Sequence, residues 1–487
     1  MGNKRWFYLL IGIVLAIGAV SFFTLDSPQL NNTKEVASTV DSSGGTQEVV
    51  ELSDQELLEK FALALQIIED QYIDEVDQTE LVEGAIKGML ETLEDPYSDY
   101  MDQDTARQFE ESLDSHFEGI GAEVSMVDGK VTIVAPIRDS PAERAGLQPN
   151  DQIVQIEGES IEGLSLNEAV LQIRGEKGTT VTLTVERPGV NDPIEFKIVR
   201  DEIPIETVVG EMIEQDGKNI GYIIISSFSV DTAERFEEAL NELEANGIDG
   251  LVIDVRGNPG GYLKSVEDIG DLIIPGGEPI VQIENRQGQK ERHISSLNEI
   301  KPYPIVGVTD GASASASEIL AGALIEAGDY DVVGDTTFGK GTVQQTIPMG
   351  DGSQLKLSLF RWLTSAGNDI HGEGVEPTVK VMQPDYFYVP PVTAQETLKL
   401  EMLNEQIRSA QIMLTGLGFD ISRDDGFYDE ETEAAVRVFQ QDNGIESTGE
   451  IDEETAAEIQ SQIIEQIRDR ENDQQLQKAI ELIIEEK

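Results

Sequence analysis

The stretch TDGASASASEILAGALIEAGDYDVVGDTTFGKGTVQQTIP, which runs from Thr309 to Pro348, carries the strongest signals for fold and chemistry in this chain. Three serines among small residues open an apolar helical pattern, and strand-like segments flank it, as in an α/β core. Lys340 then stands between two glycines, and Gln344 follows four residues later. A serine and a lysine in such a segment can act as nucleophile and base without a histidine.

Ser315 and Glu318 form the pattern S-x-x-E before an apolar run, which predicts a capping box at the start of a helix. Helix capping is therefore one interpretation of Ser315. A helix N-terminus also suits a nucleophile, because its unpaired N–H groups and the helix dipole favour developing negative charge. The flanking alanines leave room for a substrate to approach.

Lys340 can serve as a base only if its environment lowers its pKa. An exposed lysine has a pKa near 10.4 and keeps its proton at neutral pH, whereas burial lowers that value. Lys340 follows an apolar strand and Phe338, so we expect it to be buried. Gln344 is expected to hydrogen-bond the amine and fix its direction, as a third group does in other triads.

Two other motifs overlap this region. Residues 334–341, GDTTFGKG, nearly match the phosphate-binding loop GxxxxGK[ST], but glycine stands where Ser or Thr is required, and the strand-like TVQQTIP follows instead of a helix. Residues 353–356, SQLK, match the SxxK motif of penicillin-recognising enzymes, which belongs on a helix, yet they lie in an alternating strand pattern. Neither motif is retained.

The composition excludes several classes of function. The 487 residues suffice for about two to four domains. There is no cysteine, and the three histidines have no ligand-like spacing, so neither a metal nor another cofactor is expected. Acidic residues outnumber basic ones by 94 to 34, for a net charge of −60, which argues against a nucleic-acid partner. The acidity is spread along the chain and indicates a solvated surface adapted to high salt.

The N-terminus predicts the compartment. Lys4 and Arg5 precede an apolar run from Trp6 to Leu25 that is long enough to span a bilayer. Positive charge before this run predicts that the remaining domains lie outside the membrane. A cleaved signal peptide is the alternative, but the run is long for one and no small-x-small site follows it. We therefore expect a single-pass protein anchored in the cell membrane, with its catalytic part extracytoplasmic.

The chain as a whole reads as a multidomain α+β protein. Its predicted parts are a transmembrane anchor (1–25), a flexible linker (26–51), a helical segment (52–108), a β-rich domain (109–200), an α/β core (201–390), a small helical C-terminal module (396–465) and a charged C-terminal helix (466–487). The amphipathic pattern of the helical segment fits either a cap on the next domain or a homodimer interface.

Residues 109–200 resemble a PDZ domain of the circularly permuted bacterial type. The segment GIGAEV, the segment SPAERAGLQPNDQIVQIEG and a later helix carry the resemblance. It implies a β-barrel-like fold that binds an extended peptide as an added strand and holds its terminal carboxylate with backbone N–H groups. The expected peptide-binding residues are Gly119, Ile120, Gly121, Ala122 and Arg174, and Arg174, at the end of the later helix, is also expected to couple peptide docking to the active site. A tight turn and a helix-terminal arginine are the structural alternatives.

From about Leu52 to Met382 the chain resembles the carboxy-terminal processing peptidases, tail-specific serine proteases with a Ser–Lys dyad. The motifs SASASEILAGAL, VVGDTTFGKGTVQQ, DVRGNPGGYL and HGEGVEPTVKV carry this resemblance. It implies that Ser315 is the nucleophile, Lys340 the base and Gln344 its partner. Ala312 stands where glycine is common in the family, which leaves Ser313 and Ser317 as alternative nucleophiles.

Acyl transfer also needs donors that stabilise the oxyanion. The N–H of Ala316 is one candidate, because Ala316 directly follows the implied nucleophile. The turn NPGG, residues 258–261, is the other, and the family suggests Gly260 or Gly261. A turn that merely ends the strand LVIDVRG is the alternative.

Residues 396–465 resemble a peptidoglycan-binding module through LTGLGF, DGFYDEETEAAVRVFQQDNGI and a later G-x-x-D-x-x-T. A generic helical interaction module is the alternative. Together these observations predict a membrane-anchored serine endopeptidase that captures the C-terminal tails of protein substrates through its PDZ domain. The competing function is a non-enzymatic PDZ scaffold that tethers envelope proteins to the cell wall.

Overall fold

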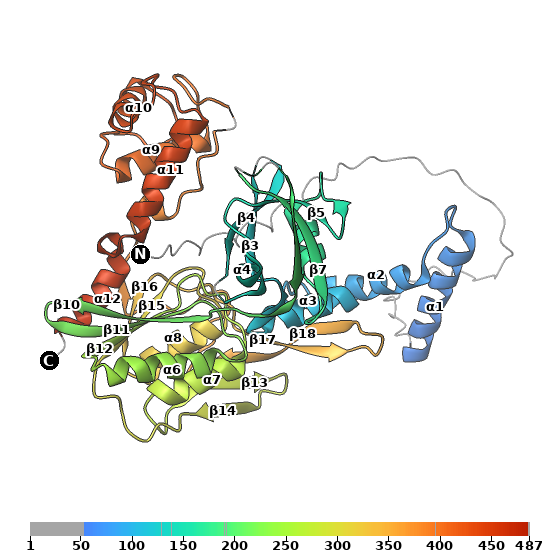
Figure 1. Ribbon diagram of the computed structural model, residues 1–487. Coiled ribbons are helices and arrows are strands. Elements are labelled where there is room, and N and C mark those ends of the chain that lie inside the picture. The colour runs from blue at the N-terminus through green and yellow to red at the C-terminus, as the bar shows by residue number, and fades with distance from the viewer. Residues whose placement is uncertain are drawn as a thin grey trace, which may run out of the picture. The chain divides into compact units, whose positions relative to one another are not determined.

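The computed structural model describes residues 53–485 except Asp128, Arg138, Gly189, Asn191 and Gln395 (Figure 1). The chain divides into two compact units, Met1–Val76 and Asp77–Lys487. The predicted transmembrane anchor (1–25) and the linker (26–51) lie outside the described residues. Within the described part, no helix is both long enough and apolar enough to cross a membrane.

The first unit contains helix α1 (Asp54–Gln71). Ser53 and Glu56 form a capping box at its start, which satisfies N–H groups that would otherwise lack partners. No residue of α1 is buried, although large apolar side chains such as Leu58 and Ile67 recur along it. The predicted homodimer interface in this segment stays a prediction.

The second unit begins with α2 (Gln78–Glu91), the short strand β1 (Asp99–Met101) and α3 (Gln103–Leu113). Strand β1 pairs antiparallel with β18 (Gln354–Leu363), and its residues Tyr100 and Met101 are buried. Part of the predicted helical segment is therefore a strand of an antiparallel sheet of the α/β core. The segment before β1, residues 95–98, reaches the candidate site described below.

The PDZ-like region is built from short strands with alternating burial, in agreement with the predicted β-rich domain. In β7, for example, Val181, Leu183 and Val185 are fully buried. The main sheet has the order β3-β4-β5-β7-β8, with β6 beside β5, and β2 pairs with β9, so β3 lies at a sheet edge. The elements are β2 (His116–Gly119), β3 (Ala122–Val127), β4 (Lys130–Pro136), α4 (Pro141–Ala145), β5 (Gln152–Ile156), β6 (Glu159–Ser160), α5 (Leu166–Ile173), β7 (Thr180–Glu186), β8 (Ile194–Val199) and β9 (Asp201–Pro204).

The α/β core contains a six-stranded sheet of order β10-β11-β12-β15-β16-β19. Its first pair is antiparallel and the other strands run parallel to β11. All residues of β12 and β15 are buried, as expected for parallel strands covered on both faces. The strands are β10 (Val208–Gln215), β11 (Lys218–Ile225), β12 (Gly250–Asp254), β15 (Ile305–Thr309), β16 (Asp331–Gly334) and β19 (Val379–Lys380).

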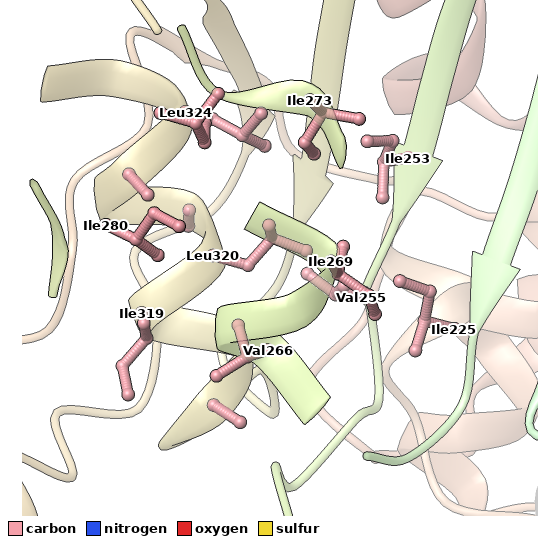
Figure 2. Packing of buried hydrophobic residues seen from close by; sticks show 14 of the residues in the cluster. Ile225, Ile253, Val255, Val266, Ile269, Ile273, Ile280, Ile319, Leu320 and Leu324 are labelled. Carbon is pink, nitrogen blue, oxygen red and sulfur yellow. The ribbon is translucent and has the colours of Figure 1, made fainter. Parts of the chain in front are cut away.

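Helices pack on both faces of this sheet. On one face, α6 (Thr232–Ala245), α7 (Leu263–Ile273) and α8 (Ala316–Glu326) form the main core cluster with the strands. Figure 2 shows Ile253 of β12 beside Ile269 and Ile273 of α7, with Leu320 of α8 nearby. Fully burying one such side chain stabilises the fold by about 1.5–3 kcal/mol. This cluster therefore fixes the position of α8, on which the candidate nucleophile depends.

A second, antiparallel sheet of the core has the order β1-β18-β13-β14, with β17 also paired to β18. Its further strands are β13 (Pro279–Asn285), β14 (Lys290–Ile294) and β17 (Thr342–Pro348). After β19, the chain forms a short 3-10 helix, η1 (Asp385–Phe387). The lysine-bearing segment enters this sheet at β17.

The C-terminal module has a hydrophobic cluster of its own. It consists of α9 (Glu405–Gly416), α10 (Glu430–Asp442) and α11 (Glu453–Arg468), and a 3-10 turn, η2 (Arg470–Asn472), leads out of it. Buried Tyr428 and Phe439 lie at the centre of this cluster. The predicted three-helix module is thus a separate packing unit within the second part of the chain.

A helix does occupy most of the predicted C-terminal helical segment (466–487), but it packs on the core sheet. Helix α11 continues to Arg468, and α12 (Gln474–Glu485) returns to the second face of the core sheet. Leu476, Ala479, Ile480 and Ile483 recur at helical spacing and form an apolar stripe. The charged residues occupy the other side of α12. Because they are numerous, the segment was predicted only as a charged helix and its apolar stripe was not recognised.

Candidate active site

Three adjacent parallel strands of the core sheet lead into the candidate site. Strand β12 continues into the glycine turn (residues 257–261), β15 into the serine turn (residues 310–315) and β16 into the lysine loop (residues 335–341). Carboxyl ends of parallel strands meet at one edge of a sheet, where ligand sites commonly form. Segments that are far apart in the sequence are therefore brought together.

Ser315 occupies the sharp turn between β15 and α8. Its φ of 55° and ψ of −111° lie in a region that residues other than glycine rarely adopt, at a cost of about 1–3 kcal/mol. The turn places this partly exposed residue at the N-terminus of a buried helix, whose dipole favours negative charge. Strain of this kind is typical of a nucleophile held on a strand-to-helix turn.

The two alternative serines have different surroundings. Ser313 and Ser317 are fully buried. The Ser313 hydroxyl donates to the carbonyl of Val255 at 2.9 Å, and the Ser317 hydroxyl donates to the carbonyl of Asn258 at 2.9 Å. Both side chains therefore fasten the serine turn to the strand and turn beside it, which leaves Ser315 as the serine with access to a substrate.

Glu318 connects the serine turn to the lysine loop. Its buried carboxylate accepts the N–H of Ser315 at 2.8 Å and the N–H of Lys340 at 2.8 Å on the same oxygen, Oε2. The other oxygen accepts the N–H of Gly339 at 2.7 Å and the hydroxyl of Thr337 at 2.6 Å. The two backbone nitrogens thus lie within two hydrogen-bond lengths of each other. The capping-box glutamate therefore serves two segments rather than one helix.

Lys340 is half-buried, and its Nζ lies 4.9 Å from the centre of the Tyr97 ring. Burial lowers the pKa of Lys340 below its ordinary value, and the positive charge of Lys356 lowers it further, while Glu318 and Asp95 act in the opposite direction. The net shift is the one that a general base requires. In this structure the Lys340 Nζ lies over the aromatic ring. Within the part of the chain that the structure describes, it donates no hydrogen bond to Ser315.

The glycines on either side of Lys340 are required by close packing. A Cβ on Gly341 would lie 2.8 Å from the Cβ of His371, and one on Gly339 would lie 3.1 Å from the backbone of Glu373. The indole N–H of Trp362 donates to the carbonyl of Lys340 at 2.7 Å. These contacts fix the backbone of the lysine loop. They do not restrain the Lys340 side chain.

Gln344 lies on β17, but its side-chain amide is engaged elsewhere. Its Nε2 donates to the hydroxyl of Thr342 at 2.9 Å and to that of Ser358 at 3.1 Å. The predicted hydrogen bond to the Lys340 amine is not formed in this arrangement. A register shift between Val343 and Gln344 changes the pairing of β17 with β18 at this point, which places the glutamine beside these hydroxyls.

The glycine turn packs directly against the serine turn. A Cβ on Gly260 would lie 2.7 Å from the Cβ of Ser315 and 3.0 Å from the nitrogen of Ala316, and one on Gly261 would lie 2.1 Å from the carbonyl oxygen of Phe228. The N–H of Gly260 donates to Asn258 Oδ1 at 2.8 Å. Among the described residues, the N–H groups of Ala316 and Gly261 have no hydrogen-bond partner. These two groups are available to an oxyanion.

The predicted peptide-binding residues of the PDZ-like region lie close together. Gly119 ends β2, Ala122 begins β3, and Ile120 and Gly121 join them. Arg174 lies beside this loop, because a Cβ on Gly119 would be 3.8 Å from its Cγ, and its guanidinium lies 4.9 Å from the Phe117 ring centre. An exposed cation thus accompanies the loop at the open edge of β3.

The two rejected motifs lie in strands. Residues 342–348 form β17, so no helix follows GDTTFGKG, and residues 354–363 form β18, which contains most of the SxxK segment. A phosphate-binding loop needs a helix N-terminus behind it, and β17 follows instead. The SxxK motif belongs on a helix, and most of its residues lie in β18. The structure agrees with the rejection of both motifs.

Four family models match parts of this chain. Residues 219–381 match peptidase family S41, residues 132–187 the PDZ domain, residues 15–105 the N-terminal domain of the activating protease CtpB, and residues 404–459 a peptidoglycan-binding domain. The chain is 54% identical over 423 residues to the carboxy-terminal processing protease CtpB of Bacillus subtilis (strain 168), a match that covers 87% of this chain and 88% of that protein. The chain belongs to the carboxy-terminal processing proteases. It is a serine peptidase, and the alternative of a non-enzymatic scaffold is set aside.

A second relative agrees with this family, and one solved structure is also similar in sequence. The protease is 39% identical over 480 residues to the carboxy-terminal processing protease CtpA of the same Bacillus subtilis strain, covering 99% of this chain and 98% of that protein. Among solved structures, the photosystem II D1 C-terminal processing protease is 26% identical, covering 70% of this chain and 95% of that one with a TM-score of 0.42.

Sequence reasoning did not identify three residues that shape the site of this protease. Glu318 was interpreted only as a capping residue, Asn258 only as part of a turn, and Tyr97 was not considered. Asn258 is fully buried and binds the glycine turn and the serine turn at once, since its side chain accepts the N–H of Gly260 and its carbonyl accepts the Ser317 hydroxyl. Glu318 and Asn258 are polar residues within the motifs SASASEILAGAL and DVRGNPGGYL. Their position inside these motifs was the signal that could have identified them.

Proposed function

We propose that this protease binds the C-terminal tails of protein substrates through its PDZ domain and cleaves the substrates through an acyl-enzyme formed on Ser315, with Lys340 as the base. The observation that carries the proposal is the carboxylate of Glu318, which binds the backbone N–H groups of both residues through a single oxygen. A strained serine at a helix N-terminus and a lysine with a lowered pKa then share one site.

In the proposed reaction, neutral Lys340 takes the proton of the Ser315 hydroxyl, and the Oγ atom attacks the scissile carbonyl carbon. The N–H groups of Ala316 and Gly261 stabilise the resulting oxyanion. Lys340 then gives its proton to the leaving amine, and an ester between Ser315 and the substrate's acyl group remains. Water, deprotonated by Lys340, hydrolyses this ester and restores the enzyme.

Two side-chain movements are needed before this reaction can begin. The Lys340 amine has to leave the Tyr97 ring and approach Ser315. Gln344 acts on the amine only if its amide exchanges the hydroxyls of Thr342 and Ser358 for Lys340. Both are rotations of long side chains on a fixed backbone. The proposed role of Gln344 is to orient the amine once it has turned towards the serine.

Tail capture is proposed for the loop of Gly119, Ile120 and Gly121 together with Arg174. The N–H groups of Ile120 and Gly121 have no hydrogen-bond partner among the described residues, and β3 is an open sheet edge to which a peptide strand can be added. The nearby guanidinium supplies the positive charge that a terminal carboxylate favours. The substrate class is therefore a polypeptide with a free, extended C-terminus.

Replacing Arg174 by alanine is expected to raise KM for an unfolded substrate with a free C-terminal carboxylate by about tenfold to 100-fold, because a hydrogen bond to a charged group contributes about 1.5–3 kcal/mol. The measurement compares the same substrate with its tail free and amidated. The wild type should prefer the free tail, and Arg174→Ala should lose that preference. Lys177→Ala is the control, since this exposed cation is already paired with Asp201 and Glu202. An unchanged preference in Arg174→Ala would rule out this carboxylate site.

The location of the protease is also a proposal. The apolar run 6–25 behind Lys4 and Arg5 supports a membrane anchor with the catalytic part outside, and the match of residues 404–459 supports binding to peptidoglycan. We expect the full chain in the membrane fraction and accessible to protease added outside the cell, and a chain without residues 2–25 in the soluble fraction. A chain without residues 396–465 should no longer sediment with isolated cell wall. Full chain found in the soluble fraction would contradict the anchor.

A further inference from the structure

The C-terminal module leaves the peptidase core and returns to it at a single point. The chain departs after β19 at Gln383 and re-enters at Asp473, just before α12. The side chain of Gln383 donates to Asp473 Oδ1 at 2.5 Å and accepts the N–H of Gln474 at 3.1 Å. We call Gln383, Asp473 and Gln475 the neck. The module is therefore an insertion between the last strand and the last helix of the core.

Two residues of the neck, Asp473 and Gln475, bind one core residue, Arg256. The guanidinium donates to both carboxylate oxygens of Asp473, at 2.9 and 2.8 Å, and to Gln475 Oε1 at 3.1 Å. On its other side it donates to Asp254 at 2.6 Å, and Asp254 also accepts the hydroxyl of Tyr222 at 2.7 Å. The side chains of Arg256, Asp473 and Asp254 are only 17%, 14% and 5% exposed.

The charges in this network are strongly coupled. Burial disfavours the ionised form of Asp473, but the hydrogen bonds and charge of Arg256, together with hydrogen bonds from Leu476 and Gln383, keep the pKa of the Asp473 carboxyl below its ordinary value. A bidentate pair between a guanidinium and a carboxylate fixes geometry as well as charge. Arg256 therefore has one defined position while α12 is docked on the sheet.

Arg256 is the residue immediately before the glycine turn. After it, the N–H of Gly257 donates to Asp310 at 3.0 Å, and the carbonyl of Asn258 accepts the N–H of Ala314 at 3.0 Å. Gly260 then packs against Ser315. The neck thus contacts the residue just before the glycine turn, and the other end of that turn contacts the proposed nucleophile.

We propose that Asp473 is a positioning residue for catalysis: it fixes Arg256, and through Arg256 the glycine turn, so that the oxyanion site is in place only when α12 closes the neck. This inference rests on the proposed roles of Ser315 and the glycine turn. Its consequence is that the last residues of the chain, well beyond the part that matches peptidase family S41, belong to the catalytic unit. The inserted module is attached at the point where the turn is controlled.

The geometry of an oxyanion site has a large effect on rate and a small effect on binding. A displacement of about 1 Å can reduce the rate by about 100-fold, and loss of one oxyanion donor reduces kcat by about 100- to 1,000-fold. A positioning role therefore predicts a loss in kcat with KM nearly unchanged. A purely structural role predicts a lower unfolding temperature with normal kcat in the molecules that remain folded.

The experiment measures kcat, KM and the unfolding midpoint for full-length Asp473→Asn, Asp473→Glu and Glu244→Gln, each assayed well below its own midpoint. Glu244 is the matched control, since it also forms a partly buried ion pair in the core, with Lys301 at 2.7 Å, away from the glycine turn. We expect Asp473→Asn to lower kcat about 30-fold with KM within about twofold. Asp473→Glu should restore part of this loss, and Glu244→Gln should lower the midpoint and leave kcat nearly unchanged.

A normal kcat per folded molecule in Asp473→Asn would overturn the inference. If that variant does not fold, Gln475→Ala decides, because it removes one acceptor of Arg256 and leaves the ion pair with Asp473 intact. We expect about a threefold loss in kcat per folded molecule, together with a lower midpoint because the buried Gln475 also donates to the carbonyl of Val381, and an unchanged kcat per folded molecule would again overturn the inference. Ser315→Ala in the same assay separates the two proposals. Activity in Ser315→Ala would refute the mechanism, whatever Asp473 does.

Discussion

Alanine at Ser315 or at Lys340 is expected to reduce peptide hydrolysis by about 10⁴- to 10⁶-fold, and the double variant should be no worse than either single one, because nucleophile and base act as one unit. Both side chains project from backbone that Glu318 already fixes, so neither truncation should disturb the fold. The measurement is turnover of an unfolded protein, with products identified by mass spectrometry, for each variant at equal folded concentration.

Ser313→Ala and Ser317→Ala are the matched controls for the serine register. Each removes a buried hydroxyl that bonds a backbone carbonyl, which should cost about 1–3 kcal/mol of stability while the folded molecules keep their nucleophile. If Ser315→Ala kept full activity and Ser313→Ala or Ser317→Ala had none, the proposed assignment of Ser315 as the nucleophile would be wrong.

The pH dependence of the same reaction tests Lys340 as the base. The neutral amine is the active form, so activity should rise with pH as Lys340 loses its proton. Burial and the charge of Lys356 lower the pKa of Lys340 from the ordinary 10.5, and the midpoint of the rise should lie below that value. Lys356→Gln removes one of these causes and should move the midpoint upwards. A downward movement would contradict the assignment.

Replacing Glu318 by glutamine is expected to reduce kcat by at least about 100-fold and to destabilise the fold by roughly 2–4 kcal/mol. The carboxylate accepts four hydrogen bonds, two on each oxygen, and three of the donors are backbone N–H groups. An amide replaces one accepting oxygen by an NH₂ group. In either orientation that group faces at least one backbone N–H, which is left buried without a partner, and the serine turn and lysine loop separate.

Urea unfolding and steady-state kinetics check this prediction. Glu326→Gln is the control, because Glu326 lies on the same helix and accepts the N–H of Ala366 at 2.7 Å, but it is exposed and lies at the far end of α8. We expect its effect on both quantities to be small. Normal kcat in Glu318→Gln would show that the shared carboxylate only stabilises the fold and does not align Ser315 with Lys340.

The sequence predicted the α/β core well because its strands and helices are local patterns. Largely apolar runs such as GLVID and IVGVT became buried parallel strands, and the helix after SASAS began where its capping residue stands. The PDZ-like strands likewise followed from their period-two alternation. The strand that lies between the first helices of the second unit was not predicted, because β1 has three residues and depends on pairing with β18.

The candidate site divides in the same way. Ser315 and Lys340 could be named from motifs in which each residue has close neighbours of defined type. The direction of Gln344 could not, because it depends on which hydroxyls β18 presents across the sheet. The role of Tyr97 was also out of reach, since its ring meets Lys340 from a segment more than two hundred residues away in the chain.

By itself, the sequence determined the α/β core and the helix that presents Ser315, and it predicted the order of the domains and the proposed nucleophile and base, because these depend on propensities and contacts within a few residues. Tertiary structure alone decided that Glu318 joins both catalytic segments, and that Asp473 reaches Arg256 across 217 residues. Charged and polar residues look alike in sequence whether they lie in solvent or in a buried network. Only the packing that removes water from them shows which partners they bind, and that packing is a property of the whole fold.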